Sequence, residues 1–504
     1  MTQPFDLLVI GGGVNGAGIA RDAAGRGLSV LLCEQGDLAG ATSSASTKLI
    51  HGGLRYLEHY EFRLVREALF ERERLLESAP HIIWPLRFIL PHAKGVRPAW
   101  LVRLGLFLYD HLAPRRRLPG TATLKLTTHP AGQALKPGFD TAFAYSDCWV
   151  EDSRLVVLSA IDAAERGADI RVRTRVTAGR RDGGGWRATL HDVDTGAESE
   201  VRARAVVNAA GPWVAEVLNA RLGLHTTKGV RLVRGSHIVV PKLFEGEHAF
   251  ILQNSDKRIV FAIPFQGRFT LVGTTDVPVK TGPGEAAISD DEVRYLCDAM
   301  NRVFRRVIAP DDVVWTYSGV RPLYDDGSPD ASAVTRDYVF DLDHADGEAP
   351  VLSIFGGKIT TFRKLAEHAL AELKPFFPGL KPAWTADAKL PGGDLPEADF
   401  ERFLAAFRSR HPFLPEALAR RLARAYGTRA EHLLADARSL ADLGEDFGGI
   451  TAAEVDYLHA REWARSAEDI LWRRSKLGLH VAAGAAERID AYLLSRKAAA
   501  IAAQ

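Results

Sequence analysis

A glycine-rich turn near the N-terminus, built from Gly11, Gly13 and Gly16, constrains the fold of this chain more than any other feature. A short apolar run at 5–10 precedes the turn, and a run of small residues at 17–26 follows it. A continuous apolar run is typical of a parallel strand buried on both faces, and the run of small residues predicts a helix. The pattern therefore predicts the strand–turn–helix half of a βαβ unit.

The spacing of the three glycines is that of a dinucleotide-binding turn. One glycine permits the tight turn, one lets the backbone approach a pyrophosphate, and one allows close packing of helix on strand. The diphosphate then meets the N–H groups and the positive dipole end of the helix. A second predicted strand, 29–33, is followed by Glu34, which is placed to accept hydrogen bonds from an adenosine ribose. The alternative is a glycine-rich loop in a buried turn without a ligand.

The segment 41–56, just after this ribose-binding strand, favours FAD over NAD. It crowds hydroxyl groups, glycines and basic groups together. Such a loop can donate hydrogen bonds to phosphates and then run along an isoalloxazine ring. A solvated Ser/Thr-rich loop is the alternative, but the apolar residues of 54–57 are not typical of a solvent-exposed loop. The cofactor ligands predicted in this segment are Thr42, Ser43, Ser44, Ser46, Lys48, Leu49 and His51.

The length of 504 residues predicts two or three domains. Strand patterns dominate 231–275 and predict an antiparallel domain inserted into the first, whereas the chain beyond 390 is rich in helix formers. The predicted limits are a nucleotide-binding domain at 1–80, continued at about 150–225 and 318–385, a substrate or cap domain at 81–149 and 226–317, and a helical domain at 386–504.

Charge and cysteine content restrict the partners. The formal net charge of +1 provides no global field for nucleic acid, and no such partner is expected. Cys33, Cys148 and Cys297 are widely spaced, so no zinc or iron–sulfur site is predicted, and this usage fits a reducing compartment. No apolar stretch approaches the ~20 residues that span a bilayer, so any membrane contact is expected to be peripheral.

Several long motifs resemble those of the FAD-dependent glycerol-3-phosphate dehydrogenases, and more narrowly those of the bacterial aerobic, respiratory enzymes. The similarity runs from the N-terminus into the C-terminal helices. The motifs are SSASTKLIHGGLRYLE at 43–58, YSDCW at 145–149, GSHIVVP at 235–241, GTTD at 273–276, SGVRPL at 318–323, FGGKITT at 355–361, DLGEDFG at 442–448 and WRR at 472–474.

This resemblance implies an α/β fold: a Rossmann-like FAD-binding domain of the D-amino-acid-oxidase type, an inserted mostly antiparallel substrate domain and a C-terminal α-helical domain. It implies oxidation of sn-glycerol 3-phosphate to dihydroxyacetone phosphate, with electrons passed to membrane quinone. It also implies a homodimer in the cytoplasm, attached peripherally to the inner membrane. The further cofactor contacts expected are Val176, Ala210, Gly211, Trp213, Gly319, Gly357, Lys358, Ile359 and Thr360.

A phosphorylated substrate requires cationic donors, because a phosphomonoester carries nearly two negative charges at neutral pH. Arg55, Arg321 and Lys358 each lie beside a glycine or proline turn in otherwise apolar or hydroxyl-rich surroundings. Ordinary salt bridges are the alternative explanation for these charges. The hydroxyl groups predicted to add hydrogen bonds to the substrate are those of Tyr56, Thr274 and Thr275.

The reaction also needs a base, because hydride transfer from C2 of the substrate to flavin N5 accompanies loss of the hydroxyl proton. Histidine suits this role near neutral pH, and His51 and His237 are the candidates, although an isolated histidine is more often structural. Arg321 and Lys358 are also expected to stabilise reacting charge. The N–H groups of 356–361 precede a predicted helix and are expected to face the flavin C2 carbonyl. With no cysteine motif for covalent attachment, FAD is expected to be noncovalent.

Residues 91–119 combine apolar residues at helical spacing with basic residues at both ends. This pattern predicts an interfacial helix whose apolar face enters an anionic lipid surface and admits quinone. A helix packed on the protein core is the alternative. The apolar residues are Trp100, Leu101, Leu104, Phe107, Leu108 and Leu112, and the basic residues are Lys94, Arg97, Arg103, Arg115, Arg116 and Arg117.

Two other functions remain open at this point. The first is a flavin oxidase that passes electrons to oxygen, acting on glycerol 3-phosphate or on an amino acid or amine. An amino-acid carboxylate needs one arginine, so three cationic groups disfavour that version. The second is a FAD-bound protein without catalytic activity, which would leave Arg55, Arg321 and Lys358 without a purpose.

Overall fold

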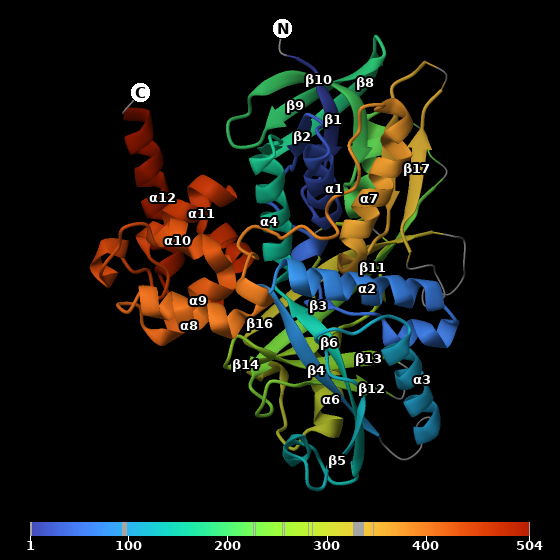
Figure 1. Ribbon diagram of the computed structural model, residues 1–504, viewed down its shortest axis with the longest axis vertical. Coiled ribbons are helices and arrows are strands. Elements are labelled where there is room, and N and C mark those ends of the chain that lie inside the picture. Colours follow the sequence, from blue (N-terminus) through green and yellow to red (C-terminus); the bar gives the residue numbers. More distant parts are fainter. Residues whose placement is uncertain are drawn as a thin grey trace.

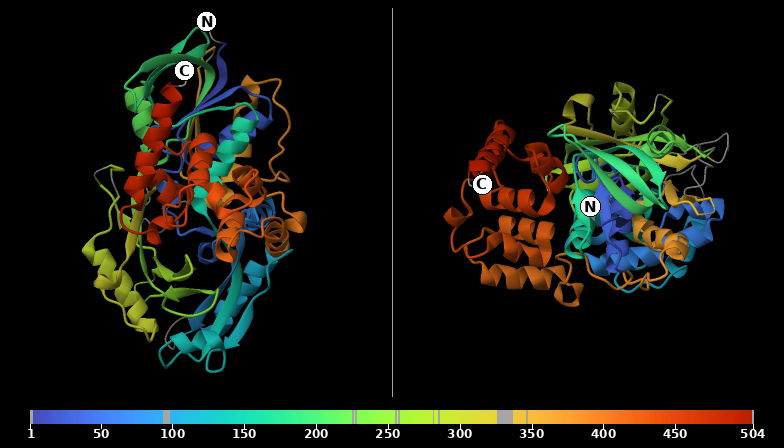
Figure 2. Two further views of the ribbon diagram at one scale, coloured as in Figure 1. Left: turned by 90° about the vertical axis from the view of Figure 1, so that its left-hand side faces the viewer. Right: turned by 90° about the horizontal axis from the view of Figure 1, so that it is seen from above.

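The computed structural model describes residues 3–92, 98–224, 226, 228–254, 256, 258–280, 282–284, 286–325, 337–345 and 347–502. Two β-sheets with their covering helices form the larger part of the molecule (Figure 1). A group of helices from the C-terminal part of the chain lies beside them, as Figure 1 and the right-hand view of Figure 2 show.

The first sheet holds the glycine-rich turn. Its central strand β1 is parallel to β2 and β10, and the path of the sheet runs β17-β18-β10-β1-β2-β7, with β8 and β9 joining through β10. The helices α1 (Val14–Gly25), α4 (Asp152–Glu165) and α7 (Phe362–Leu373) cover one face. The strands are β1 (Phe5–Ile10), β2 (Val30–Cys33), β7 (Asp169–Arg171), β8 (Thr174–Asp182), β9 (Gly185–Asp192), β10 (Glu198–Asn208), β17 (Val339–Asp343) and β18 (Val351–Phe355).

The second sheet is antiparallel except where β12 pairs with β4, and its path runs β15-β11-β14-β13-β12-β4-β6-β3. Helix α6 (Asp290–Val303) covers one face, and α2 (Phe62–Ser78) and α3 (Ala99–His111) cover the other. The strands are β3 (Leu49–Ile50), β4 (Ile83–His92), β5 (Ala122–Lys125), β6 (Thr141–Val150), β11 (Val230–Pro241), β12 (Ala249–Gln253), β13 (Ile259–Phe265), β14 (Phe269–Gly273), β15 (Val277–Pro278) and β16 (Trp315–Tyr324).

The C-terminal helices have a core of their own, in which Phe407, Leu458 and Ile470 are fully buried. They contact the first sheet through α4, which meets α11 and a π-helical turn called η12. The elements are α8 (Phe400–Arg410), α9 (Glu416–Tyr426), α10 (Ala430–Leu434), α11 (Ala452–Glu462), η12 (Asp469–Arg474) and α12 (Ala485–Ala502). The short helix α5 (Val214–Glu216) follows β10 and packs against the first sheet through Val214.

The fold agrees with the predicted architecture of a nucleotide-binding sheet, an antiparallel sheet and C-terminal helices. Two details differ. The sequence pattern at 169–175 predicts a single strand, but the structure divides it into β7 and β8, because Arg173 between them adopts a positive φ of 50°. The predicted domain limit at 318 falls inside β16, which pairs with β11 over its whole length and so belongs to the second sheet.

Helix α3 is the observed element within the predicted interfacial segment, and Leu106 and Tyr109 are its buried residues. Of the three consecutive arginines, Arg115 is partly buried, Arg116 is 72% exposed, and Arg117, although exposed, donates to the backbone oxygens of Glu397 and Ala398. Lys94 and Arg97 lie outside the described residues. Within the described part of the chain, no helix is both long and apolar enough to cross a membrane.

Candidate active site

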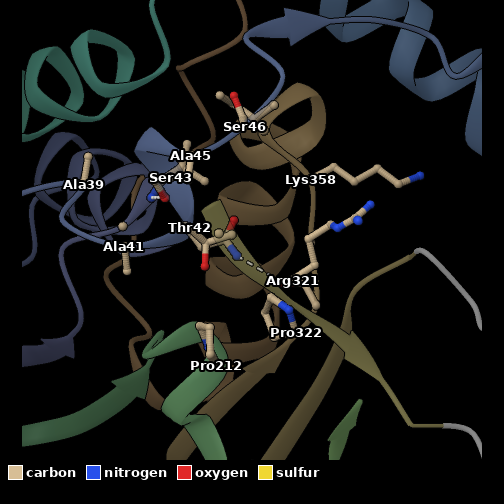
Figure 3. Close-up of a pocket in the computed structure, with 18 of the residues that line it drawn as sticks. Ala39, Ala41, Thr42, Ser43, Ala45, Ser46, Pro212, Arg321, Pro322 and Lys358 are labelled. Atoms are coloured by element: carbon tan, nitrogen blue, oxygen red, sulfur yellow. Dashed lines mark hydrogen bonds between the residues drawn. The ribbon is translucent and has the colours of Figure 1, made fainter. Parts of the chain in front are cut away.

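A cavity of about 790 Å³ is lined by residues from both sheets and from the loops at the carboxyl ends of β1, β2 and β10. In open parallel sheets, ligands bind in the crevice at the carboxyl ends of the strands, at the point where the strand order reverses. Figure 3 shows Thr42 and Ser43 on one side of the pocket and Arg321 and Lys358 on another.

The glycine-rich turn has no room for a side chain at Gly11 or Gly16. A Cβ atom at Gly16 would lie 1.9 Å from the backbone oxygen of Gly11, and one at Gly11 would lie 2.6 Å from that of Ala209. Gly11 also adopts a φ of +113°, which L-residues rarely adopt. Gly16 thus brings α1 close to β1 but does not line the cavity, whereas Gly11 and Gly13 do. The turn forms the narrow cradle that a pyrophosphate requires.

Glu34 closes the cradle at the end of β2. One carboxylate oxygen accepts a hydrogen bond from the backbone N–H of Gly12 at 2.7 Å, and the other accepts one from Gly36 at 2.8 Å. Burial of the carboxyl group raises the pKa of Glu34. Each oxygen keeps a second lone pair, so the group can also accept hydrogen bonds from a ribose.

The loop that follows is held in place by a buried ion pair. Lys48 is fully buried and donates to both carboxylate oxygens of Asp152, at 2.8 and 2.9 Å, and to the backbone oxygen of Ser44 at 3.0 Å. The hydroxyl group of Ser46 donates to the same carboxylate at 2.7 Å. These contacts fix the backbone of the loop against α4, so Lys48 and Ser44 support the cavity wall from behind.

Most of the residues predicted from the sequence line the cavity. Within the described residues, those that do not are Gly16, Ser44, Lys48 and Thr275. Those that do are Gly11, Gly13, Glu34, Thr42, Ser43, Ser46, Leu49, His51, Arg55, Tyr56, Val176, Ala210, Gly211, Trp213, His237, Thr274, Gly319, Arg321, Gly357, Lys358, Ile359 and Thr360.

Thr275 has a structural role. Its buried hydroxyl group donates to Glu292 on α6 at 2.6 Å and accepts from the backbone N–H of Ser236 at 3.0 Å. These bonds join α6 to the edge of β11, whose Gly235 lines the cavity. The predicted contact of Thr275 with substrate therefore has no support from the geometry, while its neighbour Thr274 lines the cavity.

The three cations predicted from the sequence all line this cavity. Arg321 on β16 donates to a carboxylate oxygen of Asp276 at 2.5 Å and to the backbone oxygen of Thr275 at 3.0 Å. The ammonium group of Lys358 lies 4.1 Å from the ring centroid of Tyr56. Arg55, next to Tyr56, is also part of the lining. The cavity can therefore surround a phosphate with the planar guanidinium groups of two arginines and the compact ammonium group of a lysine.

Both candidate histidines line the cavity and are uncharged near neutral pH. Burial lowers the pKa of His51, and the nearby charge of Lys358 lowers it further against the opposing effect of Asp147. Burial, with Lys48 and Arg321, lowers the pKa of His237 well below its ordinary value. A neutral imidazole can accept a proton, so either ring is chemically able to act as the base.

The two rings differ in how they are held. The Nε2 atom of His237 lies 3.0 Å from the hydroxyl oxygen of Thr47, and its ring stacks on Tyr317 with centroids 4.7 Å apart. For His51, the backbone N–H donates to the hydroxyl oxygen of Thr360 at 3.2 Å. The His237 ring is thus fixed on two sides by its own contacts.

Sequence reasoning missed several lining residues that come from distant segments. Asn15 donates to the backbone oxygen of Gly356 at 3.3 Å and so joins the first helix to the turn before α7, and its Oδ1 atom is buried without a hydrogen bond in the described structure. Asp276 was part of a recognised motif, but only the fold reveals its pairing with Arg321. Arg473 comes from the C-terminal helices, and its motif gave the only sequence signal.

Comparison with known proteins adds independent information. Residues 6–363 match the family model of the FAD dependent oxidoreductases, and residues 383–494 match that of the C-terminal domain of alpha-glycerophosphate oxidase. The chain is 55% identical to a glycerol-3-phosphate dehydrogenase of Pseudomonas aeruginosa, over 98% of the chain and 96% of the relative. It is 53% identical to the aerobic glycerol-3-phosphate dehydrogenase of Escherichia coli, over 97% of each.

Two further matches bear on substrate and fold. A D-erythritol 1-phosphate dehydrogenase of Brucella abortus is 54% identical, over 95% of the chain and 96% of the relative. The X-ray structure of the glycerol-3-phosphate dehydrogenase from Bacillus halodurans complexed with FAD superposes with a TM-score of 0.75 and 28% identity, covering 94% of this chain and 86% of that one.

Proposed function

This chain belongs to the FAD-dependent oxidoreductases that include the glycerol-3-phosphate dehydrogenases, and we propose that it oxidises sn-glycerol 3-phosphate to dihydroxyacetone phosphate. FAD is its cofactor. The observation that carries the proposal is that the nucleotide cradle, the three predicted cationic side chains and two neutral histidines line one cavity. A phosphate group on the substrate gives the cations a purpose that an uncharged alcohol would not.

The residues that line the cavity fit each part of FAD in turn. The cradle at Gly11 and Gly13 suits the pyrophosphate, Glu34 suits the ribose, and the N–H groups of 356–361 at the start of α7 suit the flavin C2 carbonyl. When bound, FAD supplies the acceptor for the hydride that leaves C2 of the alcohol, at its N5 atom.

The chain's own side chains bind, orient and deprotonate the substrate. Arg55, Arg321 and Lys358 hold the phosphate, and Tyr56 and Thr274 add hydroxyl donors. His51 or His237 takes the proton of the C2 hydroxyl group, because both rings are neutral at pH 7. Arg321 and Lys358 also stabilise the negative charge that develops on the oxygen as this proton leaves.

For the electron acceptor we propose membrane quinone, reached while the protein lies on the cytoplasmic face of the inner membrane. Support comes from α3, where Trp100 is 67% exposed and Phe107 is 57% exposed. Such side chains on one helix face are typical of insertion below lipid headgroups. Arg103 on this helix and Arg116 just after it are exposed basic residues. Homodimer formation stays a prediction from the resemblance.

The test of the reaction is anaerobic addition of glycerol 3-phosphate to the FAD-loaded protein. Bleaching of the flavin absorbance near 1:1 stoichiometry is expected, followed by reoxidation with a soluble quinone analogue. An absence of bleaching in fully loaded protein would refute the proposed reaction. Fast reoxidation by oxygen with stoichiometric peroxide, and none by quinone, would instead identify an oxidase.

A longer polyol phosphate is the second candidate substrate. The relative named for D-erythritol 1-phosphate is as similar to this chain as those named for glycerol 3-phosphate. Both substrates present a phosphate to the same cations, so the choice depends on the space beyond the reacting carbon. Comparison of kcat/KM for the two compounds decides between them, and a higher value for D-erythritol 1-phosphate would reassign the substrate.

A further inference from the structure

The C-terminal helices reach the cofactor cavity at one point. Arg473, near the end of η12, lines the cavity together with Glu34, Gly36 and Asp37 from the loop after β2. Within the described part of the chain it is the one lining residue that comes from beyond residue 383. This end of the cavity holds Glu34, so it is the adenosine end of the FAD site.

A buried carboxylate ties Arg473 to this loop. The Nε atom of Arg473 donates to Asp37 at 2.6 Å, and Arg474 donates to both oxygens of the same carboxylate at 2.7 Å. The side chain of Asp37 is 3% exposed and that of Arg474 is 0% exposed. Hydrogen bonds between buried charged groups are stronger than those at the surface. The position of the ribose-binding loop therefore depends on η12.

A second carboxylate connects η12 to the segment just before β8, which is hydrogen-bonded to the same loop through Arg173 and Gly36. Asp469 is fully buried and pairs with Arg473 and, at 3.0 Å, with Arg173. Arg173 lines the cavity just before β8, three residues from Val176. Burial raises the pKa of Asp469, but a hydrogen bond from the backbone N–H of Arg465 and the charges of Arg473 and Arg173 lower it overall, so the carboxylate stays charged. Asp469 thus aligns two guanidinium groups at the adenosine end.

We propose that the C-terminal helical domain completes the FAD site: Arg473, aligned by Asp37 and Asp469, contacts the adenosine part of the cofactor. Docking of this domain and binding of FAD are then linked. A ligand that binds only the docked form stabilises docking, and docking strengthens ligand binding by the same factor. If the cluster served domain docking alone, Arg473 would have no reason to line the cavity.

The test compares FAD release from the holoenzymes of three variants, followed by the rise of flavin fluorescence after dilution. Arg473→Ala is expected to release FAD about tenfold faster, the effect of losing one charge-assisted hydrogen bond. Arg473→Lys keeps the charge but not the planar fork of the guanidinium group. Its FAD release rate is expected to lie between those of the wild type and Arg473→Ala. Arg488→Ala is the matched control, because Arg488 pairs with exposed Glu445 in the same domain and lies outside the cavity lining.

Thermal unfolding separates a cofactor contact from a purely structural role. If Arg473 contacts FAD, the increase in Tm that FAD gives to the stripped full-length protein shrinks in Arg473→Ala relative to the wild type. If the residue only docks the domain, Tm falls equally with and without FAD and the release rate stays at the wild-type value. That second pattern would overturn the proposal, as would faster release from Arg488→Ala to the same extent.

Discussion

Arg321 combines two features that single it out among the cavity cations. It lies on a strand of the second sheet, and its guanidinium group is already oriented by Asp276 and by the backbone oxygen of Thr275. We expect Arg321→Lys to lower kcat/KM for glycerol 3-phosphate by about 10- to 100-fold, because a charge-assisted hydrogen bond contributes about 1.5–3 kcal/mol and lysine lacks the planar fork.

Steady-state kinetics of FAD-loaded Arg321→Lys measure this loss. Asp276→Asn is the matched companion, since it removes the orienting charge but leaves the arginine, and a smaller loss is expected. Unchanged kcat/KM in Arg321→Lys would show that the guanidinium group does not contact the substrate in the rate-determining complex.

The two histidines predict a pH dependence. The lowered pKa of each ring means that the neutral, proton-accepting form persists below the ordinary value of 6.5. Activity that depends on this form should therefore stay level as the pH falls from 8 through 6.5 and decline only below it. A profile of kcat/KM against pH in the wild type tests the direction, and a decline that begins above pH 6.5 would contradict it.

Single variants then identify the base. The variant that lacks the base should lose most of kcat, and its kcat/KM should no longer decline at low pH. The variant at the other histidine should keep this decline. His237→Asn and His51→Asn make the same change of size and charge at the two positions, so the two variants can be compared directly. We expect FAD content, measured by absorbance, to be similar in both, which separates chemistry from cofactor loss.

At the scale of elements, helix α3 is tied to the core by Tyr109. Its hydroxyl oxygen accepts a hydrogen bond from the backbone N–H of Gly52 at 2.8 Å, and its O–H donates one to Asp147 at 2.8 Å. The opposite face carries Trp100 and Phe107. Replacing both with serine is therefore expected to leave the fold intact and to reduce flotation with anionic vesicles several-fold, because apolar burial drives interfacial binding.

Charge makes the complementary contribution to lipid binding. Arg116→Ala should weaken binding mainly at low salt, since Arg116 is 72% exposed. Arg117→Ala should have a smaller effect, because that side chain contacts the backbone at Glu397 and Ala398. Equal flotation of wild type and the Trp100/Phe107 variant would exclude this face as the membrane contact.

The sequence predicts some of the elements of this fold and misses others. The strand at 5–10, the first helix and the turn between them follow from local patterns, because glycine spacing and apolar runs are local signals. The break at Arg173 could not be predicted, since its positive φ goes with backbone hydrogen bonds to Gly36 and Val193, which are distant in sequence. Thr275 was assigned to the substrate for a similar reason, because nothing local reveals its partner Glu292.

At the scale of the whole molecule, contacts between domains were the least predictable, because both partners are ordinary charged residues far apart in sequence. Arg154 on α4 and Glu462 on α11 form such a pair, separated by 308 residues and almost completely buried. The strong attraction of Glu462 outweighs burial and raises the pKa of Arg154. A buried pair of this kind is sensitive to loss of one partner, because the other charge is then left in the interior.

We therefore expect Arg154→Met to lower the free energy of unfolding by about 3–5 kcal/mol. The matched control is Arg420→Met, whose pair with Glu401 is largely exposed, so that a change of at most about 1 kcal/mol is expected. Removing both partners, in Arg154→Met with Glu462→Met, should recover much of the loss, since no buried charge then remains unpaired. Denaturant unfolding of the FAD-loaded proteins measures all three differences. If the double variant is no more stable than Arg154→Met, packing at this interface outweighs the charge pair in holding the C-terminal helices to α4.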